Sequence, residues 1–152
     1  MSVARASGSA LISAPARAVY ALIADYRDGH PRILPPEYFP RLEVEQGGVG
    51  AGTIIRFQVR LLGAVRDVRA AVTEPTPGSV LVETDLATGA RTTFTVTPEG
   101  GGGTCRVEIR TEWEAKGLRG WVERMTAPRI LRKLYAAELA QLAVVAAPPA
   151  GA

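Results

Sequence analysis

"ILRKLYAAELAQLAVV", residues 130–145, carries apolar residues at the three- and four-residue spacing of an amphipathic α-helix. The same spacing begins earlier, at Leu118, and Pro128 between the two parts predicts a kink or a restart of the helix. We therefore expect one long helical segment that starts after Gly117 and ends near Val145. Its apolar stripe needs an apolar surface to pack against.

The middle of the chain supplies that surface, because apolar and polar residues alternate there with the period of a β-strand. Short turns rich in Gly and Pro separate the alternating segments, and this spacing predicts an antiparallel meander. Residues 3–12 form a further predicted strand, which Gly8 weakens. The predicted meander strands are the segment around Leu42 and Val44, and residues 53–62, 65–74, 80–86, 91–97 and 104–114.

Alternation also assigns the two faces of this sheet. One face carries charges of both signs, which pair across neighbouring strands. It includes Glu83, Asp85 and Glu114, so these carboxyls are expected to face solvent and are discounted as catalytic acids. The opposite, apolar face is predicted to comprise Ile55, Phe57, Val59, Leu61, Val68, Ala70, Val72, Val80, Val82, Thr84, Leu86, Thr92, Phe94, Val96, Cys105, Val107, Ile109, Thr111 and Trp113.

Between the first strand and the meander lies "DYRDGHPRILPPEYF", residues 25–39, with the only histidine of the chain, His30. The segment follows a short helix that is predicted from apolar residues at helical spacing. We expect it to form the rim and lid of a cavity, with Tyr38 and Phe39 as a rigid wall. His30 and Arg32 are interpreted as surface groups of this loop.

Three stretches carry a resemblance to a known superfamily: "ISAPARAVYALIADYRDGHPRILP", "EVEQGGVGAGTIIRF" and "LRKLYAAELAQLAVVA". In these stretches and in the order of its elements, the chain resembles the START-like or SRPBCC superfamily, close to its polyketide cyclase/dehydrase and lipid-transport group. The resemblance implies an α+β helix-grip fold. In that fold, a curved antiparallel sheet of about seven strands wraps around a long C-terminal helix, with a short helix or helices after the first strand. We expect a single domain over residues 1–147 and a disordered tail over residues 148–152.

The resemblance also implies a deep hydrophobic cavity between sheet and helix. An apolar concave face with few inward ionisable groups favours binding of a hydrophobic small molecule (a lipid, polyketide or quinone-like compound) with no chemistry required. The residues expected to contact this ligand are Ile23, Tyr26, Ile33, Leu34, Tyr38, Phe39, Phe57, Val59, Val68, Ala70, Val82, Thr84, Phe94, Val96, Ile109, Thr111, Trp121, Met125, Leu131, Leu134, Tyr135 and Glu138.

Two other functions stay open. A polyketide cyclase/dehydrase-like enzyme, a lyase, would use His30, Tyr38 or Tyr135 as acid–base groups in the cavity. It requires that His30 or Tyr135 project into the cavity beside another polar group. A lipid or quinone carrier would dock on a membrane or a partner protein through the basic residues between Lys116 and Lys133.

Other classes of function are not indicated. A single cysteine, Cys105, and a single histidine exclude a disulfide framework and leave too few ligands for a metal site, so no metal and no cofactor are expected. "GGVGAG" and "EGGGGT" lead into strands rather than helices, which excludes phosphate binding. A net charge of +3 with scattered arginines does not predict nucleic-acid binding. Without a membrane-spanning apolar run or a signal peptide, the chain is expected to be cytoplasmic, as a monomer or homodimer.

Overall fold

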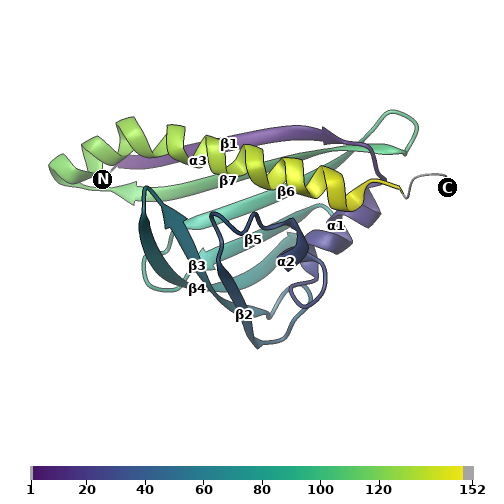
Figure 1. Cartoon of the computed structure of the whole chain (residues 1–152), viewed down its shortest axis with the longest axis horizontal. Helices are drawn as coiled ribbons and strands as arrows, with labels where there is room; N and C mark the ends of the chain where they lie inside the picture. The colour runs from purple at the N-terminus through teal and green to yellow at the C-terminus, as the bar shows by residue number, and fades with distance from the viewer. Residues whose placement is uncertain (1, 149–152) are drawn as a thin grey trace.

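The computed structural model describes residues 2–148, apart from the side chains of Ser2 and of residues 118–125. Figure 1 shows one curved sheet with a long helix lying along it. The strands are β1 (Ser2–Ile12), β2 (Arg41–Gln46), β3 (Ile54–Leu61), β4 (Ala64–Thr76), β5 (Val80–Asp85), β6 (Arg91–Glu99) and β7 (Thr104–Ala115). The helices are α1 (Ala16–Ala24), α2 (His30–Ile33) and α3 (Gly117–Ala146).

The strands form a seven-stranded antiparallel sheet in the order β1-β7-β6-β5-β4-β3-β2. Consecutive strands are neighbours from β2 to β7, and β1 returns to the far edge beside β7. The prediction of an α+β helix-grip fold with about seven strands is therefore confirmed. The predicted tail falls mostly on residues 149–152, which lie outside the described residues.

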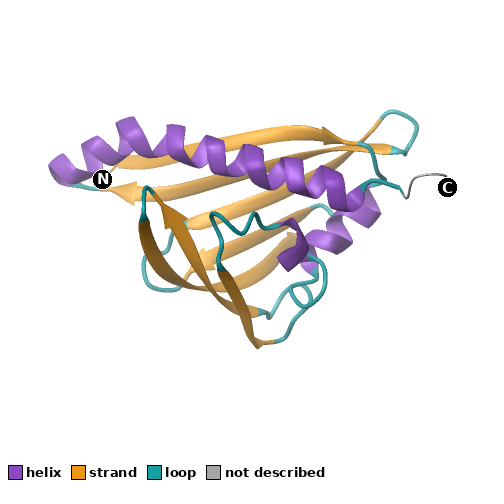
Figure 2. Cartoon of the chain, viewed as in Figure 1, coloured by secondary structure: helices purple, strands orange, loops and turns teal. Residues whose placement is uncertain are grey.

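Helix α3 runs along the β1–β7 edge of the sheet rather than across its middle (Figure 2). Its backbone stays helical through Pro128, so the predicted interruption does not end the helix. Gly8, at the centre of β1, lies directly beneath the helix: a Cβ atom placed there would be 3.2 Å from the Cβ of Tyr135. The glycine that weakens the strand pattern is thus the residue that lets the helix approach the sheet closely.

The short helices lie at one end of the sheet. Helix α1 packs on β6 and β7, and its residues Val19 and Ile23 are fully buried. The loop between β2 and β3 is tied to the end of α1, because the Tyr26 N–H donates to the Gly48 carbonyl (2.8 Å) and the Gly50 N–H to the Ala24 carbonyl (2.9 Å). "GGVGAG" therefore forms part of a structural turn that holds the start of residues 25–39.

The inner and outer faces of strand β5 are the reverse of those predicted. Leu81 is fully buried and pairs with Phe94, and Glu83 pairs with Thr92, so Leu81, Glu83 and Asp85 face the helix side. The register with β4 shifts between Thr73 and Thr76 just before this strand. The inward prediction for Val80, Val82, Thr84 and Leu86 was wrong: Val80, Val82 and Thr84 lie on the outer face, and Leu86 lies beyond the end of the strand.

Replacement of Gly8 by valine should lower the free energy of unfolding by about 1–3 kcal/mol, because the new methyl groups must displace the backbone of α3 near Tyr135. Urea denaturation measures this change. Gly101→Val is the matched control, since a Cβ at Gly101 meets no atom within 4 Å, and it should change stability by less than about 0.5 kcal/mol. Equal stability of both variants would show that the fold tolerates a wider gap between α3 and β1.

Candidate functional site

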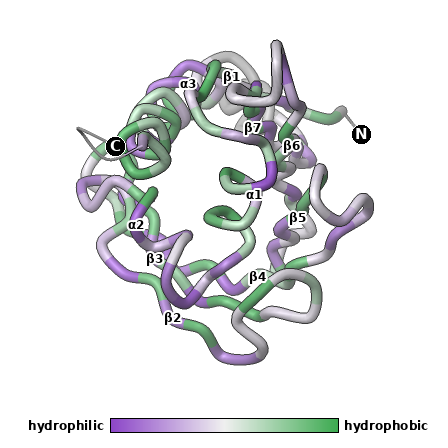
Figure 3. The backbone as a smooth tube through the Cα atoms, turned by 90° about the vertical axis from the view of Figure 1, so that its right-hand side faces the viewer, coloured by the Kyte–Doolittle hydropathy of each residue, from purple (hydrophilic) through white to green (hydrophobic). Residues whose placement is uncertain are grey.

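A cavity of about 630 Å³ lies between the inner face of the sheet and α3. Figure 3 shows the molecule from the end at which α1 lies. In this view, the strands and α3 surround α1. Most of the cavity wall is apolar, and a limited number of polar side chains interrupts it. Its described lining residues are His30, Leu34, Phe39, Leu42, Ile55, Phe57, Val59, Leu61, Arg66, Val68, Glu83, Asp85, Thr88, Ala90, Thr92, Phe94, Thr111, Trp113, Glu114, Ala127, Ile130, Leu131, Leu134, Tyr135 and Glu138.

The structure brings about half of the expected contact residues to this cavity. Those that line it are Leu34, Phe39, Phe57, Val59, Val68, Phe94, Thr111, Leu131, Leu134, Tyr135 and Glu138, together with the candidate His30. Those outside the lining are Ile23, Tyr26, Ile33, Tyr38, Ala70, Val96 and Ile109, and on the outer sheet face Val82 and Thr84. Trp121 and Met125 fall in the range whose side chains are not described, as does part of the basic segment between Lys116 and Lys133.

Sequence reasoning missed the polar residues that β4 and β5 contribute, namely Arg66, Glu83 and Asp85. The register of the β5–β6 hairpin was the available signal. Phe94 was correctly placed on the inner face, and its partner across the strands is Leu81, which puts Glu83 and Asp85 on the inner face too.

His30 is buried, with 2% of its surface exposed, so its interpretation as a surface group was wrong. The imidazole stacks on Tyr26 at a centroid distance of 4.4 Å and meets the edge of Phe94 at 5.6 Å. Nδ1 lies 2.7 Å from the Ile23 carbonyl oxygen and must donate to it, because a carbonyl only accepts. Nε2 is therefore the atom of His30 that is left to exchange a proton.

The Nε2 atom of His30 lies 3.6 Å from Oε1 of Glu83. Burial lowers the pKa of His30, and the Glu83 carboxylate opposes this effect. In the neutral imidazole, the lone pair of Nε2 faces a carboxylate oxygen, so two acceptors stand opposite each other. Uptake of one proton by the pair converts this repulsion into attraction, which makes the pair a candidate general base.

Tyr26 fixes the Glu83 carboxylate by a hydrogen bond, although Tyr26 does not line the cavity itself. Its hydroxyl donates a hydrogen bond of 2.6 Å to Oε1 of Glu83. Burial, together with the charge and the hydrogen bond of Glu83, raises the pKa of the phenol well above its ordinary value. Tyr26 therefore stays protonated and orients the Glu83 carboxylate toward His30 and the cavity.

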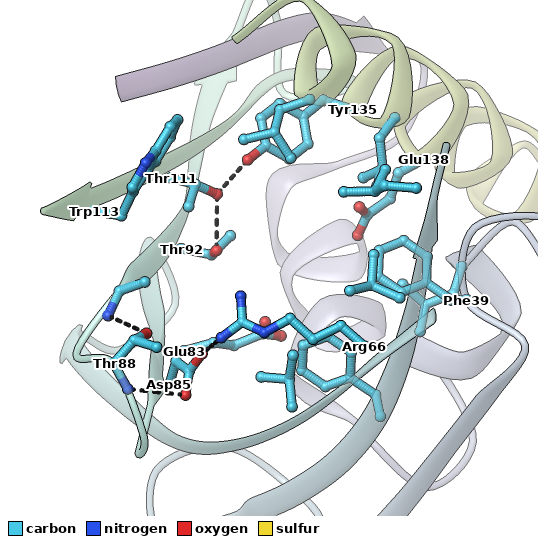
Figure 4. Close-up of a pocket in the computed structure, with 18 of the residues that line it drawn as sticks. Phe39, Arg66, Glu83, Asp85, Thr88, Thr92, Thr111, Trp113, Tyr135 and Glu138 are labelled. Carbon is cyan, nitrogen blue, oxygen red and sulfur yellow. Dashed lines mark hydrogen bonds and ion pairs between the residues drawn. The ribbon is translucent and has the colours of Figure 1, made fainter. Parts of the chain in front are cut away.

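Glu138 enters the cavity from α3, and only 3% of its surface is exposed. Figure 4 shows its carboxyl group pointing into the open space, away from the helix. Burial and then the charge of Glu83 raise its pKa well above 4.5, which favours the neutral carboxylic acid. It is a candidate proton donor.

Two further polar groups stand on the opposite walls (Figure 4). The Tyr135 hydroxyl donates to Oγ1 of Thr111, which lies 2.9 Å from Oγ1 of Thr92. Nη2 of Arg66 donates to Oδ2 of Asp85 at 2.7 Å. Oδ1 of the same Asp85 carboxylate accepts from the backbone N–H groups of residues 87 and 88, so this ion pair is built into the β5–β6 turn.

The described residues contain no group of three His, Cys, Asp or Glu side chains that could hold a metal ion. Cys105 is fully buried on β7, and burial raises the pKa of its thiol, which leaves it unreactive. Within the same described part of the chain, no helix is long and apolar enough to cross a membrane.

Comparison with known proteins gives one family and many related folds. Residues 3–147 match the family described as "Polyketide cyclase / dehydrase and lipid transport". The solution structure of KanY protein is 32% identical over 96% of this chain and 99% of its own, with a TM-score of 0.81. No curated protein matches the sequence.

Two more distant structures share the fold. A START superfamily protein from Mycobacterium smegmatis is 14% identical over 93% of this chain and 96% of its own, with a TM-score of 0.76. The Zhui aromatase/cyclase from Streptomyces sp. R1128 is 16% identical over 95% of this chain and 94% of its own, with a TM-score of 0.75. The resemblance to the START-like superfamily is confirmed.

Replacement of Glu138 by glutamine should remove a loss of stability that the parent protein suffers as the pH rises. The folded protein binds the Glu138 proton more tightly than the unfolded chain does, since burial and Glu83 oppose the charged form. Stability of the parent therefore falls from about pH 4.5 upward until the raised pKa is passed, whereas glutamine has no proton to lose.

Urea denaturation between about pH 4 and pH 8 measures this difference. Glu99→Gln is the matched control, because Glu99 pairs with Arg106 on the protein surface at 3.0 Å. The titratable groups around Glu138 are Glu83, Tyr26 and Tyr135. A stability difference between E138Q and the parent that is the same at every pH would contradict a buried, neutral Glu138.

Proposed function

The chain belongs to the polyketide cyclase/dehydrase and lipid-transport family, and we propose that it binds a hydrophobic small molecule in the cavity between the sheet and α3. The observation that carries this proposal is a cavity of about 630 Å³ with mostly apolar walls. Pockets for small molecules in proteins commonly enclose roughly 300–1,000 Å³ and hold a few placed polar groups among apolar ones. Burial of an apolar ligand here removes its surface and that of the wall from water, which favours binding.

The polar side chains give such a ligand an orientation. Glu83, Glu138 and Arg66 face the cavity from β5, α3 and β4, and the hydroxyls of Thr92 and Thr111 lie on another wall. A ligand therefore has hydrogen-bonding partners at separate positions of an otherwise apolar surface. Aromatic or polyketide compounds with a few polar substituents suit this arrangement better than a plain hydrocarbon.

Replacement of Val59 by tryptophan should abolish ligand binding without loss of stability, because Val59 is half-buried and its side chain borders the open cavity. We expect the affinity for the uncharged fluorescent probe N-phenyl-1-naphthylamine to fall by at least about tenfold, which is about 1.4 kcal/mol. Fluorescence titration measures the affinity, and thermal unfolding checks the fold.

Val82→Trp is the matched control, since Val82 lies on the outer face of β5. It should bind the probe as the parent does. Equal loss of binding in the two variants, or no binding to the parent protein, would rule out the cavity as the binding site.

A second candidate function is acid–base catalysis on the bound molecule, and the facing pair of His30 and Glu83 favours it. Both lie at the cavity wall, and Glu138, whose protonated form is favoured by burial, lines the same cavity as a candidate acid. A general base and a general acid in one apolar cavity are what a ring closure between a methylene carbon and a carbonyl requires.

The proton transfers for such a ring closure balance within the ligand and these side chains. The His30–Glu83 pair would remove a proton from a methylene group between two carbonyls. The resulting carbanion would attack another carbonyl carbon of the same molecule and form the C–C bond, and Glu138 would give its proton to the carbonyl oxygen. Loss of this hydroxyl with a second proton from the adjacent carbon releases water and leaves the double bond.

Replacement of His30 by asparagine should separate binding from catalysis. The asparagine amide can still donate to the Ile23 carbonyl as Nδ1 does, but it has no counterpart of Nε2. With a linear polyketone, we expect ring formation to slow by about a hundredfold or more, while affinity for the uncharged probe is kept. Absorbance of the aromatic product measures the rate.

Tyr38→Phe is the control for this experiment, because Tyr38 was a candidate from the sequence but does not line the cavity. It should react at the rate of the parent protein. If the parent protein forms the ring no faster than buffer does, or if H30N is as fast as the parent, the catalytic candidate is wrong and binding alone remains.

A further inference from the structure

The described part of the cavity wall holds more carboxyl groups than cations. Glu83, Asp85 and Glu138 contribute carboxyls and Arg66 contributes a guanidinium, whereas Glu114 is exposed and pairs with Lys116 at 3.6 Å. His30 adds no fixed charge, since burial favours its neutral form. Glu83 and Glu138 therefore add acidic groups to the cavity wall of a protein whose net charge is +3.

Arg66 does not neutralise the charge of Glu83 or Glu138, because its guanidinium already forms an ion pair with Asp85. Its guanidinium pairs with Asp85 at 2.7 Å, and the Asp85 carboxylate is held in turn by the backbone of the β5–β6 turn. Figure 4 shows Arg66 extending along the wall toward Asp85, with Glu138 on the opposite side of the open space. Glu83 receives its one hydrogen bond from a neutral phenol, that of Tyr26. Among the described residues, no Lys or Arg pairs with Glu83 or Glu138, and the imidazole of His30, 3.6 Å from Glu83, is uncharged unless it takes up a proton.

Glu138 is the clearest sign of a missing partner. It is 3% exposed, and among the described side chains and backbone none lies within hydrogen-bond distance of its carboxyl group. No buried side-chain oxygen or nitrogen atom of the described residues lacks a partner, so the unpaired oxygens of this carboxyl are open to the cavity rather than enclosed by protein. Its carboxyl points into the cavity (Figure 4), where a ligand is the group that can meet it.

We propose that the ligand of this cavity is a hydrophobic amine, whose protonated nitrogen binds between Glu138 and Glu83 while its apolar body lies against the walls formed by Phe57, Val59 and Phe94. This inference rests on the proposed binding function and names the chemical class of the ligand. An ammonium group carries three donors and a positive charge, and therefore suits carboxyl groups that have no Lys or Arg partner. A carboxylate ligand of the same shape is repelled by the same two groups.

The selectivity follows from geometry as well as charge. Glu83 comes from β5 and Glu138 from α3, so the two carboxyls approach the cavity from the sheet and from the helix. Tyr26 fixes the orientation of Glu83 with a 2.6 Å hydrogen bond. A nitrogen between them is held at a defined depth, and this depth decides how long an apolar body fits behind it.

Three ligands of nearly equal shape test the proposal: 2-(2-naphthyl)ethylamine, 2-propylnaphthalene and 3-(2-naphthyl)propanoate, which carry a cation, no charge and an anion. Each is titrated into parent protein that holds N-phenyl-1-naphthylamine, near neutral pH and at low salt, and displacement of the probe gives its affinity. We expect the amine to bind at least about tenfold more tightly than 2-propylnaphthalene. The carboxylate should bind at least about tenfold more weakly than 2-propylnaphthalene.

Glu138→Gln should remove most of the advantage of the amine, measured as the ratio of its affinity to that of 2-propylnaphthalene in the same variant. Glu99→Gln removes one negative charge on the surface, and it should change none of the three affinities. Glu83→Gln is a second variant that should also reduce the advantage of the amine, and it serves if E138Q does not fold.

The outcomes separate this proposal from the binding function on which it rests. If 2-propylnaphthalene displaces the probe as well as the amine does, the cavity binds apolar molecules but the inference about amines is overturned. Retention of the full amine advantage in both E138Q and E83Q also overturns it. If neither the probe nor any of the three ligands binds to the parent protein, the proposed binding function fails and the inference fails with it.

Discussion

One long helix must cover the inner face of a seven-stranded sheet, and this constraint determines the rest of the structure. Helix α3 cannot reach every strand, and the close approach at Gly8 holds it over β1 and β7. The strands from β3 to β6 curve away from it and are left without a packing partner over part of their length. The cavity is therefore a consequence of where α3 packs on the sheet, because one helix cannot cover an apolar face that is wider than itself.

The polar groups of the cavity depend on the same position of α3 over β1 and β7. Glu83 and Glu138 could not remain on a close-packed interface between sheet and helix, since a buried carboxyl without a partner is costly there. The open space lets Glu138 point away from its helix, and residues 25–39 support Glu83 through Tyr26 and His30. Residues 25–39 thus belong to the site itself: they carry the imidazole and, through Tyr26, fix the orientation of the carboxylate. Displacement of α2 would change the site directly.

Much of the fold follows from the sequence, and the errors fall where the site interrupts the pattern. The inner faces of β3, β4 and β6 were predicted from alternation, because Phe57, Val68 and Phe94 lie on continuous apolar stripes. Strand β5 was assigned to the wrong face because its inner face carries two carboxyls, and a rule that places apolar residues inside cannot select Glu83 and Asp85. His30 was misplaced for a different reason. Prolines and arginines beside it indicate an exposed loop, whereas its burial depends on contacts with Tyr26 and Phe94, which only the folded chain brings together.

Binding of an amine and acid–base catalysis make opposite demands on Glu138. As the acid of a ring closure, Glu138 must hold a proton when the ligand is bound, and its buried position near Glu83 favours that form. As the partner of an ammonium group, it must give the proton up, since the cation stabilises the carboxylate and offsets the effect of burial. A ligand with a basic nitrogen at this depth would thus suppress the acid that the chemistry needs, and a neutral polyketone would preserve it. The protonation state of Glu138 in the complex is for this reason the property that distinguishes a binding protein for amines from an enzyme that uses the same cavity.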